Sequence, residues 1–151
     1  MIVKIKEIKP GSTYNGNVHT QYIIIELGDG TEMNIFDADK KCDEDMVNTC
    51  VGVELRGEYI QQIARVDNNV KEIRPDDIDV SNGIKFLRGA VVAPISGDKD
   101  GITVDFGEGN IELIPVPTQK EQFNSFSLGD VIEVTRISEV CLYNIGHKDM
   151  V

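Results

Sequence analysis

Two glycine-rich turns, each between two segments of alternating hydrophobicity, constrain the fold of this chain more than any other feature. The first segment covers residues 22–36 and turns at Gly28–Gly30, and the second covers residues 102–114 and turns at Gly107–Gly109. A hydrophobic period of two is typical of a half-buried strand, and short glycine-containing connections are typical of β-hairpins. The sequence therefore predicts two hairpins whose turn glycines lie 79 positions apart.

The remainder of the chain divides into further strand patterns and two short helix patterns. Alternating apolar residues predict strands at residues 2–8, 51–60, 61–66, 84–93, 131–136 and 140–145. Segments 37–47 and 119–124 have no such alternation. The first begins with an aspartate suited to cap a helix, so a short helix or helical turn is expected there, and a short helix is expected at 119–124. Asn15-Gly16 and the Gly/Asp segment 96–101 predict tight turns. The fold class is all-β with short helical segments.

The two halves of the chain repeat this order of elements. At an offset of 79, the apolar positions of residues 23–27 coincide with those of residues 102–106. Five strands with a helical segment between the third and the fourth resemble the OB-fold, a small, partly open Greek-key barrel. We therefore predict two tandem five-stranded OB-like barrels from an internal duplication, at residues 1–72 and 84–151, with a linker at 73–83. Two SH3-like barrels, or one sandwich made from both halves, fit the same pattern, because barrel closure depends on non-local pairing.

Charge and cysteine usage limit the partners and the compartment. The formal net charge is −11 in 151 residues, which offers no overall positive field to phosphate, so nucleic acid is an unlikely partner. No apolar run approaches the roughly 18 residues of a membrane helix, and the first residues lack the order of a signal peptide. Three cysteines make no even disulfide framework. We expect a cytoplasmic protein that does not enter a membrane.

The sequence contains no motif that is typical of a particular enzymatic reaction. The cysteines Cys42, Cys50 and Cys141 and the histidines His19 and His147 lack the spacing of a metal site, and no nucleophile elbow or zinc-protease motif occurs. We therefore expect no enzyme, no cofactor and no metal. The leading hypothesis is an acidic binding module that recognises a protein partner or a small ligand through a strand face and loops. The alternatives are an OB-fold protein that binds single-stranded oligonucleotides, and an acidic mimic of nucleic acid that occupies a basic protein.

The hydrophobic pattern also predicts the register of the two hairpins. A three-residue loop, residues 28–30 with a left-handed Gly30, is expected in the first hairpin, and a two-residue loop, residues 108–109, in the second. The resulting opposite pairs on the inward face are Ile25 with Met33 and Ile23 with Ile35 in the first hairpin, and Phe106 with Ile111 and Val104 with Leu113 in the second.

Two groups of outward-facing residues are candidate partner-binding sites. The first is an apolar patch of Tyr22, Ile24 and Phe36, with Tyr22 opposite Phe36. The second group consists of carboxylates that face each other across the hairpins, Glu26 with Glu32 and Asp105 with Glu112. Like charges directly opposite each other are unfavourable, so we expect a nearby cation from Lys4, Lys6 or Lys85, a divalent ion, or a basic side chain of the partner.

Overall fold

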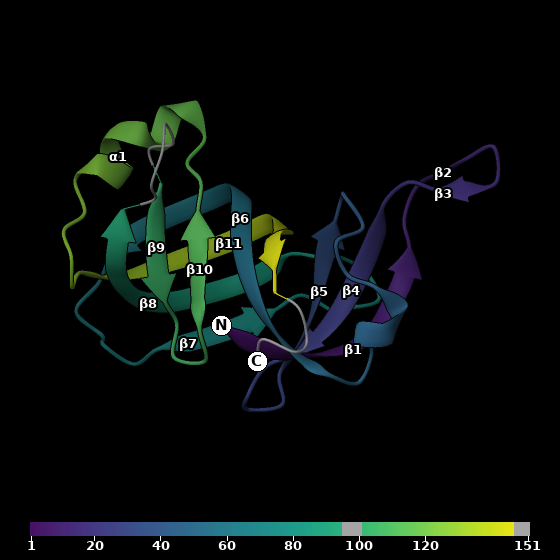
Figure 1. The fold of residues 1–151 in the computed structure, drawn as a ribbon. Helices are drawn as coiled ribbons and strands as arrows, with labels where there is room; N and C mark the ends of the chain where they lie inside the picture. Colours follow the sequence, from purple (N-terminus) through teal and green to yellow (C-terminus); the bar gives the residue numbers. More distant parts are fainter. Residues whose placement is uncertain (95–100, 147–151) are drawn as a thin grey trace.

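The computed structural model describes residues 1–94 and 101–146, whose strands form one nine-stranded sheet and a separate two-stranded ribbon (Figure 1). The strands of the sheet are β1 (Ile2–Pro10), β4 (Gln21–Glu26), β5 (Glu32–Asp37), β6 (Cys50–Arg65), β7 (Glu72–Pro75), β8 (Ile84–Pro94), β9 (Ile102–Asp105), β10 (Asn110–Leu113) and β11 (Val131–Ile145). The ribbon consists of β2 (Thr13–Tyr14) and β3 (Asn17–Val18), and the helical turns are η1 (Glu44–Met46), η2 (Pro117–Gln119) and α1 (Lys120–Asn124). The predicted all-β class is confirmed. None of the helices in these residues has the length and hydropathy of a membrane span.

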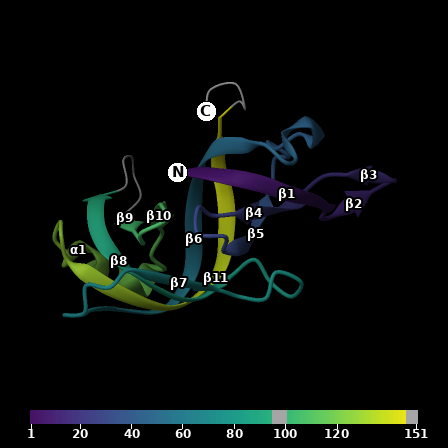
Figure 2. The same ribbon diagram turned by 90° about the horizontal axis from the view of Figure 1, so that it is seen from below.

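The sheet closes on itself twice around two shared strands. Its order is β1-β4-β5-β11-β6-β10-β9-β8-β7, with additional pairings of β1 with β6 and of β11 with β8. Ring one is therefore β1, β4, β5, β11 and β6, and ring two is β6, β10, β9, β8 and β11. Figure 2 shows β1, β4 and β5 on one side of β6 and β11, and β8, β9 and β10 on the other. Each ring takes strands from both halves of the chain, and the division at residues 73–83 stays a prediction.

The long strands β6 and β11 correct the predicted strand pattern. Strands were expected at 51–60 and 61–66, and at 131–136 and 140–145, but each pair is one continuous strand. The two strands pair antiparallel from Ile132 opposite Arg65 to Ile145 opposite Val53. No Gly, Pro or Asn occupies residues 58–65, so the chain lacks the turn residues that would fold β6 back on itself.

A left-handed residue in each long strand changes which face of the strand is buried. In β6 the buried positions alternate up to Gly57, the next buried residues are Ile60 and Ile63, and Tyr59 has a φ of 58°. In β11 the buried Val134 is followed by Ile137, and Arg136 between them has a φ of 66°. The pairing of β6 with β11 keeps one register past both residues, so neither is an inserted bulge residue, and the left-handed backbone itself interrupts the alternation. Each long strand can therefore direct apolar side chains into both rings.

The first hairpin has the predicted register and the second does not. Ile25 lies opposite Met33 and Ile23 opposite Ile35, and Gly30 has a φ of 90°, so both predictions are confirmed. In the second hairpin the predicted pairs of Phe106 with Ile111 and of Val104 with Leu113 are wrong. The pairs are instead Ile111 with Val104 and Leu113 with Ile102. Its loop has two residues, as predicted, but they are 107–108, because Gly107 (φ 103°) takes the left-handed position and Phe106 N–H donates to Gly109 O.

The predicted helices and linker are confirmed only in part. The helix expected at 119–124 is present as α1, whereas segment 37–47 contains only the single turn η1. Asp37 ends β5, and its carboxylate accepts hydrogen bonds from the backbone N–H groups of Lys41 and Cys42, which hold this segment as a loop. Part of the predicted linker forms β7, which pairs with β8. The turn expected at 96–101 falls largely on residues 95–100, which lie outside the described residues.

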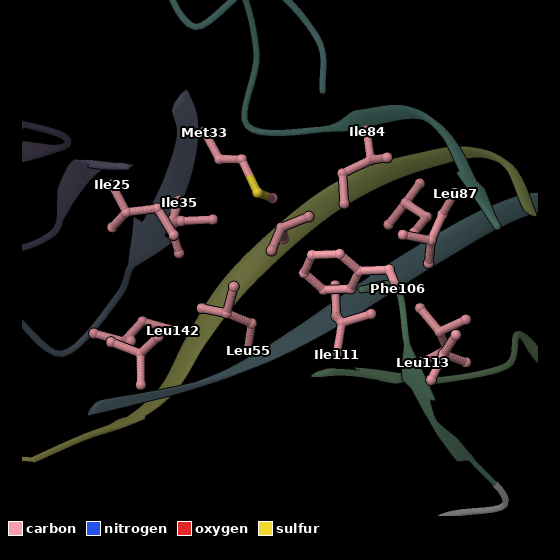
Figure 3. Close-up of a cluster of buried hydrophobic side chains, with 14 of the residues drawn as sticks. Ile25, Met33, Ile35, Leu55, Ile84, Leu87, Phe106, Ile111, Leu113 and Leu142 are labelled. Carbon is pink, nitrogen blue, oxygen red and sulfur yellow. The ribbon is translucent and has the colours of Figure 1, made fainter. Parts of the chain in front are cut away.

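One continuous apolar core fills both rings. Its buried side chains come from every long strand and form a single cluster. Figure 3 shows Ile25, Ile35 and Leu142 toward one end of the paired strands β6 and β11 and Leu87, Phe106 and Leu113 toward the other, with Leu55 and Ile111 between them. All of these side chains belong to one buried cluster, so the two rings share a continuous apolar core.

Replacing Tyr59 with glycine tests the left-handed conformation in β6. A left-handed conformation costs a non-glycine residue roughly 1–2 kcal/mol, which offsets the roughly 0.5–1 kcal/mol that glycine loses in chain entropy. The free energy of unfolding of Y59G, measured in urea, should equal that of the wild type or exceed it by up to about 1 kcal/mol. The matched control Q62G, at an exposed position of β6 with ordinary strand geometry, should lose about 0.5–1 kcal/mol. Equal losses in both variants would contradict the left-handed conformation of Tyr59.

Candidate functional site

A groove of about 470 Å³ lies between β1, the ribbon β2–β3 and the loop that contains η1. We call it the ribbon groove, and its main lining residues are Ile8, Pro10, Val18, Gln21, Asp43 and Glu44. Its volume is within the roughly 300–1,000 Å³ of ligand-binding pockets. Apolar side chains come from β1 and the ribbon, and carboxylates come from the η1 loop. The groove therefore combines apolar contact area with an acidic wall.

The ribbon is a short hairpin that projects from the sheet (Figure 1). Asn15 (φ 51°) and Gly16 (φ 79°) both have left-handed backbones, the geometry of the tight turn that this sequence predicts. Hydrogen bonds fix its base, from Gly11 N–H to Thr20 O at 2.8 Å and from Ser12 N–H to the Thr20 hydroxyl at 2.8 Å. The ammonium group of Lys40 on the η1 side donates to Val18 O at 3.2 Å and so crosses the groove.

A buried carboxylate fixes the opposite wall of the groove. Asp37 is fully buried, and it accepts hydrogen bonds from the Gln21 side chain at 2.8 Å and from the N–H groups of Lys41 and Cys42 at 2.9 Å each. Gln21 also donates to Cys42 O at 2.8 Å. These bonds tie the start of β4, the end of β5 and the η1 loop together, so the wall has a fixed shape. Burial raises the pKa of the Cys42 thiol to about 12, and the negative charges of Asp37 and Asp43 add to this effect.

The predicted apolar patch is assembled but not open. Tyr22 lies opposite Phe36, with ring centroids 5.1 Å apart, and both side chains are partly buried. Ile24, expected to share an outward surface with them, is only 2% exposed. The loop of residues 76–83 lies over this face, where the Asn34 side chain donates to Ile78 O at 3.1 Å. The chain itself covers most of this patch.

The predicted carboxylate pairs are half confirmed. Glu26 lies opposite Glu32, and Lys6 reaches Glu26 at 3.4 Å, while Lys4 is the β1 neighbour of Glu26. The pair Asp105 with Glu112 is wrong, because the shifted register places Asn110 opposite Asp105 and Thr103 opposite Glu112.

The cations beside these two acids differ from the expected Lys85. Lys71 lies 2.8 Å from Asp105, and Arg56 lies 2.7 Å from Glu112. The hydrogen bond from Lys71, supported by the Gly107 N–H, lowers the pKa of Asp105. Both carboxylates are therefore neutralised within the chain.

A second cluster lies on the middle of the shared strand pair. Glu58 and Glu139 face each other on the central rung of β6 and β11, and Cys141 lies beside them, with ligand atoms of all three within 4.8 Å of one another. Two carboxylates and a thiol could hold a divalent ion such as zinc. Sequence spacing could not reveal this set, because strand pairing alone brings residues 58 and 139 together. Burial, with the charges of Glu139 and Glu58, raises the pKa of the Cys141 thiol to about 12.

The chain matches no protein-family model, no curated protein and no solved structure with which it was compared.

Replacing Asp37 with asparagine tests the wall of the groove. An amide presents N–H groups where the carboxylate accepts bonds from three donors, so at least one buried donor loses its partner, at about 1–3 kcal/mol. We expect D37N to lower the free energy of unfolding by that amount. The control D39N, at an exposed position two residues on, should change it by less than about 0.5 kcal/mol. A D37N variant as stable as D39N would show that these hydrogen bonds do not hold the loop.

The raised thiol pKa values predict selective alkylation. Iodoacetamide reacts with the thiolate, so at mildly alkaline pH the exposed Cys50 should be alkylated well before Cys42 and Cys141, as followed by peptide mass spectrometry. The double variant E58Q/E139Q removes two charges that oppose thiolate formation and should speed alkylation of Cys141 but not of Cys42. Equal rates at all three cysteines in the folded protein would contradict these assignments.

The raised thiol pKa values also predict how stability depends on pH. The folded state holds the thiols of Cys42 and Cys141 protonated, so their contribution to the free energy of unfolding is fully present below pH 9.0 and declines as the pH rises toward about 12.

Proposed function

We propose that this chain is a non-enzymatic acidic binding module that takes a protein partner in the ribbon groove. The observation that carries the proposal is the groove itself, which has a fixed wall at Asp37, a projecting ribbon and an apolar lining open to solvent. Tyr14 on the ribbon is 69% exposed, and exposed tyrosines are enriched where proteins bind each other. No catalytic arrangement in the described residues competes with this use of the groove.

Oligonucleotide binding is less well supported, because the basic side chains that it requires are paired with acids. Lys6 reaches Glu26, Arg56 binds Glu112 and Arg65 binds Asp130 within 3.4 Å. A partner phosphate would have to displace these carboxylates, in a chain of net charge −11. A protein partner faces no such competition.

We further propose that each ring is an OB-like barrel and that the two arose by duplication, with their last strands exchanged. Three features support this reading. Both rings consist of three consecutive antiparallel strands closed by β6 and β11. The register between the first two strands shifts at matching places, after Ile5 opposite Ile25 in ring one and after Val91 opposite Val104 in ring two. Residues 25 and 104 keep the offset of 79 that the sequence predicts, whereas their partners, residues 5 and 91, are 86 positions apart.

Capture from a nuclease-treated lysate of the source cells tests the proposed function. Immobilised wild type should retain a protein partner, and V18D, which places a charge in the groove, should lose it. The matched control V70D makes the same change at a 61% exposed position away from the groove and should retain the partner. Capture of the same proteins by V18D and the wild type would rule out the ribbon groove as the binding site.

A further inference from the structure

The wall of the ribbon groove that β1 provides is a strand edge covered over only part of its length. Ile2 to Lys4 pair with β6, and next to them Ile5 N–H donates to Thr49 O and Asn48 N–H donates to Ile5 O, at 3.0 and 2.7 Å. Beyond Ile5 the neighbouring chain turns away into the η1 loop. Ile8 and Pro10 pair with β4 on one side, and on the edge away from β4 they line the groove and pair with no strand of the described chain.

The pairing of β1 with β4 determines which backbone groups this edge presents. Gly11 N–H donates to Thr20 O, and bonded pairs alternate along an antiparallel ladder, so Lys9 and Glu7 also bond to β4. The N–H and C=O groups of Ile8 and the C=O group of Pro10 then point away from β4. Ile5 also directs its backbone groups away from β4. The register shift between Ile5 and Glu7 changes the alternation at this point, so that Glu7 bonds to β4 although it lies two residues after Ile5. Three main-chain hydrogen-bonding groups therefore face the groove.

We infer that an extended basic segment of a protein partner binds as an added strand along β1 at Ile8–Pro10. Addition of a strand to an exposed edge is a common mode of peptide recognition, in which main-chain hydrogen bonds hold the segment and alternate side chains give specificity. The inference deepens the proposed function and rests on it.

The charges around the groove determine which charge the added segment should carry. Asp43 and Glu44 on the facing wall are exposed, and no ion pair to either is found within the described ranges. Glu7, next to Ile8, is exposed as well. Lys9 lies 3.5 Å from Asp79, and Lys40, which lines the groove and donates to Val18 O, keeps its positive charge. Glu7, Asp43 and Glu44 outnumber this one cation. An anionic segment, or a second copy of this acidic chain, would meet repulsion here.

The apolar lining determines the spacing of the added side chains. Ile8 packs partly on the core, and Val18 and Cys42 lie across the groove from it. Side chains of a strand alternate between its two faces, so one face of the added segment should carry apolar side chains against this lining and the other face basic ones. Alternating valine and lysine represent this chemistry.

The test uses a synthetic peptide of about six alternating lysines and valines, the common length of a strand, added to the isotope-labelled full chain. Amide NMR spectra should show shifts that centre on Ile8, Lys9 and the η1 loop, and hydrogen exchange at Ile8 N–H should slow. The peptide with glutamate in place of lysine should give no shifts, and N-methylation of alternate peptide amides should abolish binding. Shifts of equal size with the glutamate peptide, or binding that survives N-methylation, would overturn the inference.

Two sets of variants locate the contacts. I8P removes the outward N–H without breaking the bonds of β1 to β4, because proline is tolerated at strand edges. It should weaken peptide binding at least tenfold, whereas the control I8V should not. D43N/E44Q should weaken binding about two- to fivefold per charge and reduce its salt dependence. Amide dispersion of I8P confirms that it is folded, and if it does not fold, the N-methylated peptides decide the question.

The outcomes separate this inference from the proposed function. If the lysine peptide fails while lysate capture still depends on Val18, the groove binds its partner in another way, and only strand addition is rejected. If capture does not depend on Val18, the proposed function itself fails.

Discussion

The antiparallel pairing of β6 with β11 is the interaction on which the rest of the structure depends. It extends from Ile132 opposite Arg65 to Ile145 opposite Val53, and both rings close on it. Removing either strand would open both rings at once, because the first part of each strand serves one ring and its later part serves the other. The left-handed residues Tyr59 and Arg136 make this double use possible, since they change the buried face along each strand.

The shared pair also places a like-charged rung at its centre. Glu58 lies opposite Glu139, an arrangement that costs up to about 1 kcal/mol relative to neutral residues. Some outward carboxylates elsewhere on the strands have cationic neighbours, such as Glu133 with Arg88 at 2.6 Å and Asp105 with Lys71 at 2.8 Å. In the ribbon groove Asp43 and Glu44 resemble Glu58 and Glu139 in having no such neighbour among the described residues. In the groove, this unpaired negative charge lies beside an open strand edge.

Local features of the fold were predictable from the sequence, and non-local pairing was not. Gly28–Gly30 fixed the loop and register of the first hairpin, and Asn15-Gly16 indicated the turn of the ribbon. In the second hairpin both Gly107 and Gly109 could take the left-handed position, and the hydrophobic alternation is the same for either choice, so the register was missed by two residues. The lack of turn residues around Tyr59 could have indicated that residues 51–66 form one strand. Which strands then pair depends on contacts between distant segments.

The candidate site was harder to predict, for the same reason. Tyr22 and Phe36 face each other as expected, but residues 76–83 fold over them. No local sequence pattern predicts that this loop covers them. The ribbon groove needs β1, the ribbon and the η1 loop together, and Asp37 reads in the sequence as a helix cap although it is a buried acceptor for three donors. Only the ribbon turn pointed toward this region.

The most direct test of the shared-strand architecture is hydrogen exchange of backbone amides at increasing denaturant. If both rings depend on β6 and β11, amides of β4 in ring one and of β9 in ring two should exchange with the same free energy and the same denaturant dependence, those of global unfolding. Exchange of one ring at a clearly lower free energy, while the other stays protected, would show two independent units and contradict the account.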